Sequence, residues 1–424
     1  MSMRICIFED EYYPRLFPLC YIRPVYDLRC GQLTLREKIA RVYPDDIFIL
    51  MARDYLRNVV KEKHPGSYVN EIPADTDRLL LINGRILYTG EVARSFVDPS
   101  RDVIYVSGEV VVGGWLSGDN LNILRKRAGR GVVVRDDFNH IDKVELAGVE
   151  LVDYPWELVR RNGEQLVLDF RLAAVGKPGM QGKVYEGAHL LNPDNIHIGK
   201  ASKVMPGAVL DAENGPVYVA RNVEVMPNAV IRGPAFIGEG SIIRAGARIY
   251  EKTSIGENCR VGGEVDASII HGHSNKQHDG FLGHSYIGEW VNIGAGSSNS
   301  DLKNDYGSVR VYNGGTMVDT GLQHAGLTMG DHSKCGINFS FNTGTVVGVF
   351  SNLFGTAIPP RYVPSFSWGE RPEALTIYRL EKAIEVARTV MRRRNVELSS
   401  AEEELIRRVF ELTAEERDAG GLKK

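Results

Sequence analysis

The sequence is poor in cysteine and has no long apolar run. Its five cysteines are scattered through 424 residues without a CxxC spacing, which favours a reduced, cytoplasmic protein without structural disulfides or a cysteine zinc site. No apolar stretch approaches the roughly 18 residues that cross a bilayer, and the first residues lack the apolar core of a signal peptide. The formal net charge is only −3, so no basic field favours nucleic acid. We therefore expect small-molecule partners, and neither a membrane nor a nucleic acid.

Glycine, by contrast, is abundant, and the glycine-rich second half carries a repeat. Aliphatic residues recur there at every sixth position: Val219, Val225, Ile231, Ile237, Ile243, Ile249, Ile255 and Val261. A period of six fits neither a helix nor a single strand. It is typical of a solenoid in which each hexapeptide forms one short strand and a turn. We predict a left-handed parallel β-helix, and the handedness is taken from known hexapeptide-repeat proteins.

Four segments are expected along the chain. Residues 1–152 alternate apolar strands with helical patterns, which predicts an α/β domain with a mostly parallel sheet. Residues 153–184 form a linker helix and connection, and residues 185–368 form the β-helix, with an inserted loop or arm between Ser298 and Thr328 where the repeat is poor. Residues 369–424 hold two amphipathic helices. We expect these helices to cap the open end of the solenoid.

The repeat breaks within "SNKQHDGFLGHSYIGEWVNIGAG", residues 274–296. An unchanged register would place His273 and Asp279 inside the coil, and burying them unpaired would cost several kcal/mol. The register must therefore shift, and these polar side chains should face a surface. Six of the ten histidines lie between His271 and His332. One interpretation is structural, because histidines can stack in ladders along a solenoid.

Two kinds of functional site remain possible for the segment in which the repeat breaks. His273 and His278 are five residues apart, as are two zinc ligands of the γ-class carbonic anhydrases. The third histidine of that family would fall near Ile237, which is an aliphatic core position, so we predict no metal site. The other chemistry is acyl transfer to an amine, with a histidine as general base and backbone N–H groups of the glycine-rich turns steadying the oxyanion. It needs no covalent intermediate, so Cys335 is read as a core residue.

The same segment resembles the acetyltransferase half of GlmU-type bifunctional enzymes of UDP-N-acetylglucosamine synthesis. Their pattern H-x-x-Y-L-G followed by V-N-I-G-A-G matches "HDGFLG" and "VNIGAG" without a gap. The resemblance implies that His278 is the general base and Asn292 a substrate-site asparagine. The implied substrate-binding residues are Arg244, Lys276, Phe281 (in place of a tyrosine), Asp301 and Asn304. A departure is Asp266, which stands where the family has a lysine.

Over nearly its whole length the chain resembles GlmU-family proteins described as sugar nucleotidyltransferases. Ordinary members carry a glycine-rich phosphate loop and a metal-binding Gly-Asp pair. This sequence has neither, since "EDEYYPRLFPLCYIRPVYDLRCG" follows the first strand and Gly84-Arg85 occupies the place of the pair. The nucleotide-binding candidates are Arg15, Arg23, Arg29, Lys38, Asn83 and Gly84. Ordinary surface or interdomain ion pairs are an equally good interpretation of these cations, and Mg²⁺ is expected only if this domain is active.

The expected function is a sugar-nucleotide pathway transferase. The β-helix would transfer an acetyl group from acetyl-CoA to an amino-sugar phosphate, and the N-terminal domain would bind a nucleotide sugar. Two alternatives stay open: a sugar-1-phosphate nucleotidyltransferase whose β-helix only assembles the oligomer, and a non-catalytic nucleotide-sugar-binding protein. By family analogy, a homotrimer is expected.

Overall fold

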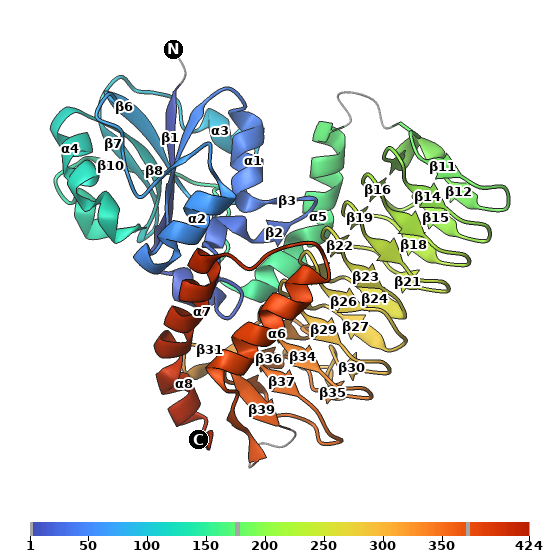
Figure 1. The fold of residues 1–424 in the computed structure, drawn as a ribbon. Helices are drawn as coiled ribbons and strands as arrows, with labels where there is room; N and C mark the ends of the chain where they lie inside the picture. Colours follow the sequence, from blue (N-terminus) through green and yellow to red (C-terminus); the bar gives the residue numbers. More distant parts are fainter. Residues whose placement is uncertain (1–2, 174–178, 370–373, 424) are drawn as a thin grey trace.

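The computed structural model describes residues 3–173, 179–369 and 374–423. Figure 1 shows an N-terminal α/β domain beside a long solenoid, with helix α5 (Pro155–Ala173) between them and the C-terminal helices α6, α7 and α8 below the α/β domain. Among the described residues, no helix is both long enough and apolar enough to cross a bilayer.

The N-terminal sheet forms where the sequence predicts it and is mostly parallel, as expected. Its strands run in the order β10-β7-β8-β6-β1-β4-β5, and only β8 is antiparallel to its neighbours. The two central strands, β1 and β6, are buried almost throughout: their middle residues are apolar, and Glu9 and Asp10 at the end of β1 are buried in ion pairs. The strands are β1 (Arg4–Asp10), β4 (Ile47–Met51), β5 (Tyr68–Val69), β6 (Arg78–Asn83), β7 (Val103–Ser107), β8 (Val110–Ser117) and β10 (Lys143–Glu145), and β9 (Val132–Val133) pairs with the end of β1.

Short helices connect these strands. Helix α1 begins at a capping box, in which the Thr34 side chain accepts from the Glu37 backbone N–H and the Glu37 carboxylate accepts from the Thr34 backbone N–H. The segment between β1 and α1 contains only 3₁₀ turns and a small hairpin, so it lies across the end of the sheet instead of forming a phosphate loop. The elements are α1 (Leu35–Val42), α2 (Arg57–Lys63), α3 (Gly90–Arg94), α4 (Gly118–Arg127), the hairpin β2 (Arg29–Cys30) and β3 (Leu33–Thr34), and 3₁₀ turns η1 (Tyr13–Leu16), η2 (Val25–Asp27), η3 (Asp54–Leu56), η4 (Ala128–Arg130) and η5 (Arg135–Phe138).

The solenoid is a parallel β-helix of hexapeptide repeats, as predicted. Three parallel sheets form its faces. The nine-stranded sheet contains β13 (Ile196–Ile198), β16 (Val217–Val219), β19 (Ala235–Ile237), β22 (Thr253–Ile255), β25 (Ile269–Ile270), β28 (Tyr286–Ile287), β33 (Thr328–Met329), β36 (Val346–Val347) and β38 (Tyr362–Val363). The six-stranded sheet contains β12 (His189–Leu191), β15 (Val209–Asp211), β18 (Val230–Arg232), β21 (Arg248–Ile249), β24 (Glu264–Asp266) and β27 (Phe281–Gly283), and it is continued by the pair β30 (Ser298–Asn299) and β35 (Ser340–Phe341).

The third face is an eleven-stranded sheet that runs the full length of the solenoid. Its strands are β11 (Lys183–Val184), β14 (Lys203–Val204), β17 (Glu224–Val225), β20 (Ile242–Ile243), β23 (Arg260–Val261), β26 (Asn275–Lys276), β29 (Asn292–Ile293), β34 (Lys334–Cys335), β37 (Asn352–Leu353), β39 (Ser367–Gly369) and the antiparallel β40 (Thr376–Ile377). The aliphatic residues of the six-residue repeat point inward and form one continuous core.

The break in the repeat is a change of coil length, which confirms the predicted register shift. Regular coils pair residues 18 apart, as in Ile237 with Ile255. The next coil is shorter, since Val261 pairs with Lys276, 15 residues on. Lys276 thereby takes an interior position of the eleven-stranded sheet, where its neighbours are aliphatic. Its Nζ bends to the corner and donates to the carbonyls of Gly262 (2.9 Å) and His278 (3.0 Å).

The predicted insertion after Ser298 leaves the coil and returns to it. Ile287 pairs with Met329, so this turn of the solenoid is 42 residues long. The insertion contains the hairpin β31 (Arg310–Asn313) and β32 (Thr316–Asp319). Val309 and Val311 pack with Trp156 of α5 in a separate small core. The insertion therefore folds back toward the linker helix.

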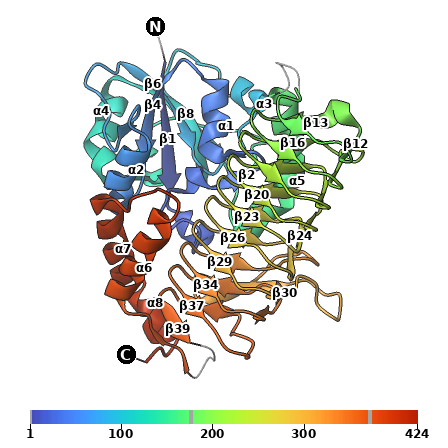
Figure 2. The ribbon, with the colours of Figure 1, turned by 45° about the vertical axis from the view of Figure 1, so that its right-hand side comes forward.

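The C-terminal helices α6 (Leu380–Arg392), α7 (Ser400–Leu412) and α8 (Ala414–Ala419) do not cap the solenoid, so that prediction is wrong. Figures 1 and 2 both place α6 and α7 between the N-terminal domain and the lower coils. Ile384, Ile406 and Val409 belong to a core that joins the N-terminal domain to the last coils, since it also contains Phe350 and Phe366. The end of the solenoid is closed instead by β40 and Leu422, which join the solenoid core.

Candidate functional site

The predicted nucleotide site lies at the carboxyl ends of β1, β4 and β6, where open α/β sheets usually bind ligands. Two buried ion pairs fill this edge. Glu9 binds the Arg53 guanidinium through both carboxylate oxygens, each at 3.0 Å, and Asp10 binds Arg85, whose side chain is fully buried. A Cβ at Gly84 would lie 2.9 Å from the Tyr26 ring. The chain's own side chains thus occupy the crevice.

The cations proposed for phosphate are engaged in ion pairs. Arg23 reaches Asp331 and Glu289 of the solenoid at 2.5 and 3.2 Å, and Arg29 reaches Glu257. Lys38 binds Asp169 of α5 at 2.7 Å with both side chains fully buried. Arg15 pairs with Asp153, and Asn83 donates to Asp10. The interdomain ion pairs that the sequence left open are therefore what the structure shows.

Two of the six clustered histidines, His273 and His332, belong to a structural ladder. His273, Trp290, His332, Phe350 and Phe366 occupy the same corner of consecutive coils, and their rings stack with centroids 4.1 to 6.1 Å apart. Each has a positive φ between 55° and 61°, a conformation that non-glycine residues seldom adopt. His273 also lies 3.1 Å from a Glu289 oxygen, and buried His271 contacts the Tyr286 hydroxyl. The side chains of these histidines are engaged in ring stacking and polar contacts within the fold.

His278 is different, because its ring is exposed. It lies at the corner between the eleven-stranded and six-stranded sheets, two residues after Lys276. Burial lowers the pKa of Lys276 from 10.5 to about 8, and Asp279 only partly opposes this shift. Arg244 occupies the same corner two coils earlier: its N–H binds Val261 O, and Gly262 N–H in turn binds Lys276 O. Among the described residues, no carboxylate lies within ion-pair distance of Arg244.

The remaining predicted residues do not gather at His278 within one chain. Asn292 lies on the eleven-stranded sheet opposite Asn275 and is partly exposed. Phe281 is partly buried on the outer face of the six-stranded sheet, beside Glu264 of the preceding coil. Asp301 belongs to a different corner, and Asn304 is exposed beyond it on the insertion. Cys335 fills an interior position, and burial raises the pKa of its thiol.

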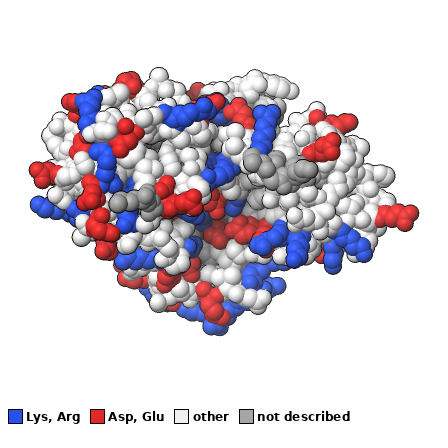
Figure 3. All heavy atoms as spheres, turned by 90° about the horizontal axis from the view of Figure 1, so that it is seen from above, with Lys and Arg blue, Asp and Glu red and all other residues white. Residues whose placement is uncertain are grey.

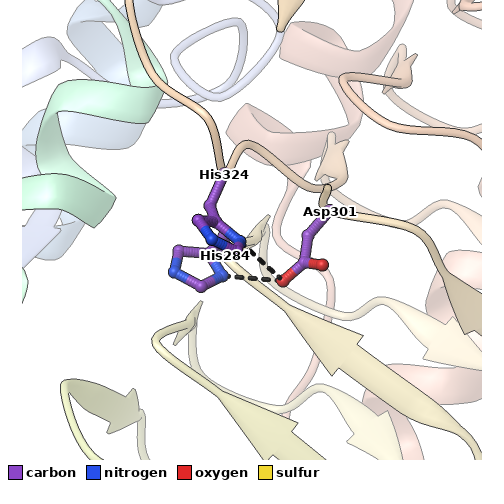
Figure 4. Close-up of side chains that lie close together, drawn as sticks. All are labelled: His284, Asp301 and His324. Atoms are coloured by element: carbon purple, nitrogen blue, oxygen red, sulfur yellow. Dashed lines mark hydrogen bonds and ion pairs between the residues drawn. The ribbon is translucent and has the colours of Figure 1, made fainter. Parts of the chain in front are cut away.

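Asp301 belongs to a second cluster that the sequence did not assemble. Its Oδ2 lies 2.7 Å from His284 Nδ1 and 4.0 Å from His324 Nδ1, and the two imidazoles stack with centroids 4.7 Å apart (Figure 4). The rings line a cavity of about 220 Å³ together with Trp156, Arg160 and Lys252. No pattern in the sequence pairs His324 with His284, because the insertion brings them together.

Asp266 lies one coil before His284, which lines this cavity. Burial raises the pKa of Asp266, the His284 charge lowers it, and repulsion from Asp301 raises it further. Viewed from above, basic and acidic side chains are interspersed on the outer face of the molecule (Figure 3). This mixture of charges is consistent with the net charge of −3. Ligand binding therefore depends on the residues of the site itself and not on an extended surface of one sign.

Comparisons with known proteins agree with this architecture. Residues 5–177 match the family described as sugar nucleotidyl transferase. The chain is 31 % identical over 126 residues to a bifunctional sugar-1-phosphate nucleotidylyltransferase/acetyltransferase of Sulfurisphaera tokodaii, covering 30 % of each protein. It is 27 % identical over 300 residues to the bifunctional protein GlmU of Methanococcus aeolicus, covering 66 % of this chain and 70 % of that one. The predicted resemblance to GlmU-type proteins is confirmed.

Other matches are shorter or structural. The bifunctional protein GlmU of Acidithiobacillus ferrooxidans is 41 % identical over 105 residues, which cover 24 % of this chain and 22 % of that protein. Several of the relatives are thus matched over less than a third of their length. A solved UDP-N-acetylglucosamine acyltransferase of Francisella novicida aligns over 58 % of this chain and 86 % of its own, with 14 % identity and a TM-score of 0.30.

Proposed function

We propose that this protein is a sugar-nucleotide pathway transferase whose β-helix transfers an acetyl group from acetyl-CoA to an amino-sugar phosphate. The observation that carries the proposal is the exposed ring of His278, which lies within the one segment that matches the GlmU acetyltransferase pattern without a gap. The nearby His273 and His284 stack on other rings, whereas His278 is exposed to solvent. Arg244 on the same corner offers a guanidinium for the acceptor phosphate.

In this mechanism the acceptor amine attacks the thioester carbonyl. His278 takes the proton from the amine as the C–N bond forms. Collapse of the tetrahedral intermediate breaks the C–S bond, and the CoA thiolate leaves and takes up a proton. Asn292 orients the acceptor in this scheme, and the Gly-rich corners supply backbone N–H groups to the oxyanion.

The proposal includes a homotrimer in the cytoplasm. The corner of His278 is a convex edge of a single chain, so a second copy would be needed to supply the facing wall of an acyl-CoA groove. The six-stranded sheet is the face that neither α5 nor the C-terminal helices cover in Figures 1 and 2. Light scattering of the purified chain tests this point, and a monomer at micromolar concentration would contradict it.

We further propose that the N-terminal domain does not transfer nucleotides and serves to brace the β-helix. The support is the crevice filled by Tyr26 and by the pairs Glu9–Arg53 and Asp10–Arg85. A site for Mg²⁺ would need free carboxylates at this edge, and these two carboxylates already bind arginine. The Mg²⁺ dependence expected of an active domain is therefore not part of the proposal.

The test is release of CoA thiol from acetyl-CoA in the presence of an amino-sugar 1-phosphate. His278→Ala should lower kcat by about 10²- to 10⁴-fold, the usual contribution of a general base. His189→Ala is the matched control, because His189 is an exposed histidine on an early coil of the same solenoid. Turnover that is equal in wild type and His278→Ala would overturn the assignment of the base, and no turnover with any amino-sugar phosphate would overturn the function.

A further inference from the structure

The cluster of His284, Asp301 and His324 is built from three separate pieces of chain. His284 lies at the corner after β27, Asp301 opens the insertion after β30, and His324 closes the insertion before β33. One nitrogen or oxygen atom from each residue lies within 4.8 Å of the other two. Figure 4 shows a nitrogen of each imidazole facing the same oxygen of Asp301. The ends of the insertion thus place three good metal ligands around a single position.

We propose that these three side chains bind one divalent transition metal ion, with zinc as the best fit. Two imidazoles and one carboxylate are a ligand set that zinc uses when one coordination position stays open. Bonds of about 2.0–2.2 Å in a tetrahedral site separate ligand atoms by about 3.3–3.5 Å. The distance of 2.7 Å from Asp301 to His284 must therefore widen, and that of 4.0 Å to His324 must shorten. Both changes are below about 1 Å.

The surroundings permit this adjustment. The His324 side chain is 44 % exposed and belongs to the insertion, so it can rotate without disturbing the coil. Asp301 is held close to the backbone of Gly283, because a Cβ there would collide with Oδ2, the oxygen that faces the two imidazoles. The partly buried Asp266 of the preceding coil adds negative potential near His284. A cation at the cluster would be stabilised by this second carboxylate.

The fourth coordination position would open into the adjoining cavity of about 220 Å³. Arg160 and Lys252 lie at its wall, and among the described residues neither has a carboxylate within ion-pair distance. These two cations favour an anionic ligand, such as a phosphate or carboxylate group, beside the metal. The cavity lies at a different corner from His278, so the proposed site is separate from the proposed acetyl-transfer site.

A second group of potential ligands, Glu257, His273 and Glu289, provides a contrast. Arg29 neutralises Glu257, Arg23 neutralises Glu289, and the His273 ring stacks on Trp290. Bringing a dication there would place it beside two buried guanidinium groups, at a high electrostatic cost. No arginine or lysine pairs with Asp301 among the described residues, which is why the first group alone is proposed as a metal site.

The experiment uses the full chain, freed of metal by a chelator and then dialysed. Calorimetric titration with Zn²⁺ should give one site per chain, and Co²⁺ should produce the intense visible absorption of a four-coordinate ion. His324→Ala and Asp301→Asn should weaken binding by more than the 10–100-fold that follows loss of an outer partner of a metal ligand. His273→Ala is the matched control and should bind like the wild type.

Two results would overturn the proposal. One is the absence of saturable Zn²⁺ binding to the wild type. This result would mean that the cluster only provides a hydrogen bond between His284 and Asp301. The other is equal binding by the wild type, His324→Ala and Asp301→Asn. Because His324 is partly exposed, its variant should fold normally, and a thermal melt verifies this. None of these measurements depends on acetyl transfer, so the two proposals can fail separately.

Discussion

Arg85 and Asp10 form a buried ion pair that closes the carboxyl edge of the N-terminal sheet. Arg85 Nη2 lies 2.6 Å from Asp10 Oδ2, its Nε lies 2.9 Å from Oδ1, and the Arg85 side chain is fully buried. Arg85 comes from the end of β6 and Asp10 from the end of β1. The pair lies at the strand ends where a parallel sheet of this kind would otherwise bind a ligand.

Asp10→Asn should destabilise the protein by about 1–3 kcal/mol, since it removes the main partner of the buried Arg85 charge and leaves Arg85 its ion pair with Asp153. The free energy of unfolding from urea titration measures this loss. Asp142→Asn is the control, because Asp142 pairs with Arg101 at the surface with both side chains mostly exposed, and surface pairs contribute little. A loss below about 1 kcal/mol for Asp10→Asn would show that the pair does not close this edge.

Nucleotides should not stabilise the protein. A ligand that binds the folded state raises apparent stability by RT ln(1 + [L]/Kd), so UTP with Mg²⁺ at millimolar concentration reports even weak binding. We expect no rise in Tm and no pyrophosphate release with a sugar 1-phosphate. Acetyl-CoA serves as the positive comparison in the same thermal-shift plate. Pyrophosphate release above the enzyme-free rate would show that the filled crevice does not prevent nucleotidyl transfer.

Lys276 should make stability depend on pH between about 8 and 10.5. Its folded-state pKa of about 8 lies below the ordinary 10.5, because burial penalises the charged form. Between these values the unfolded chain binds the proton and the folded chain does not, so the stability from Lys276 rises with pH. Below pH 8 both states are protonated and the penalty is fully present.

The measurement compares wild type with Lys276→Met by urea unfolding at pH 7.5, 9 and 10. The wild type should gain about 1–3 kcal/mol relative to the variant across this range, an upper figure of one 1.36 kcal/mol step for each pKa unit. Other groups that titrate here cancel in the comparison. Lys200→Met, at an exposed position, should track the wild type. A difference between wild type and Lys276→Met that is independent of pH would mean that the ammonium reaches solvent.

The C-terminal helices should be required for the stability of the N-terminal domain. Ile406 of α7 is 3 % exposed and belongs to the core that this domain shares with the last coils of the solenoid. Ile406→Ala should cost about 2–5 kcal/mol, as large-to-small changes in a core do. Leu412→Ala, on the same helix at 41 % exposure, should cost less than about 0.5 kcal/mol. Equal melting temperatures of the two variants would indicate that α7 is only loosely attached.

Local sequence patterns were sufficient to predict the secondary-structure elements. The six-residue interval predicts the coil because each aliphatic residue fills the interior at a fixed step, from Val219 to Val261. Period and burial also predict β1, β4 and β6 in the N-terminal domain. They do not say what a helix packs against, which is why the amphipathic helices of residues 369–424 are predicted at the end of the solenoid and lie instead between the N-terminal domain and the last coils.

The sequence alone thus determined the repeat and the change of register, since both follow from which residues can be buried at a given spacing. Only the tertiary structure decided the pairing of distant charges, such as Arg23 with Asp331 and Lys38 with Asp169. It also decided the meeting of His284 with Asp301 and His324. The physical reason is that such contacts depend on how the insertion and the two domains pack against one another. A charged residue has many possible partners in the sequence, and packing determines which of them it meets.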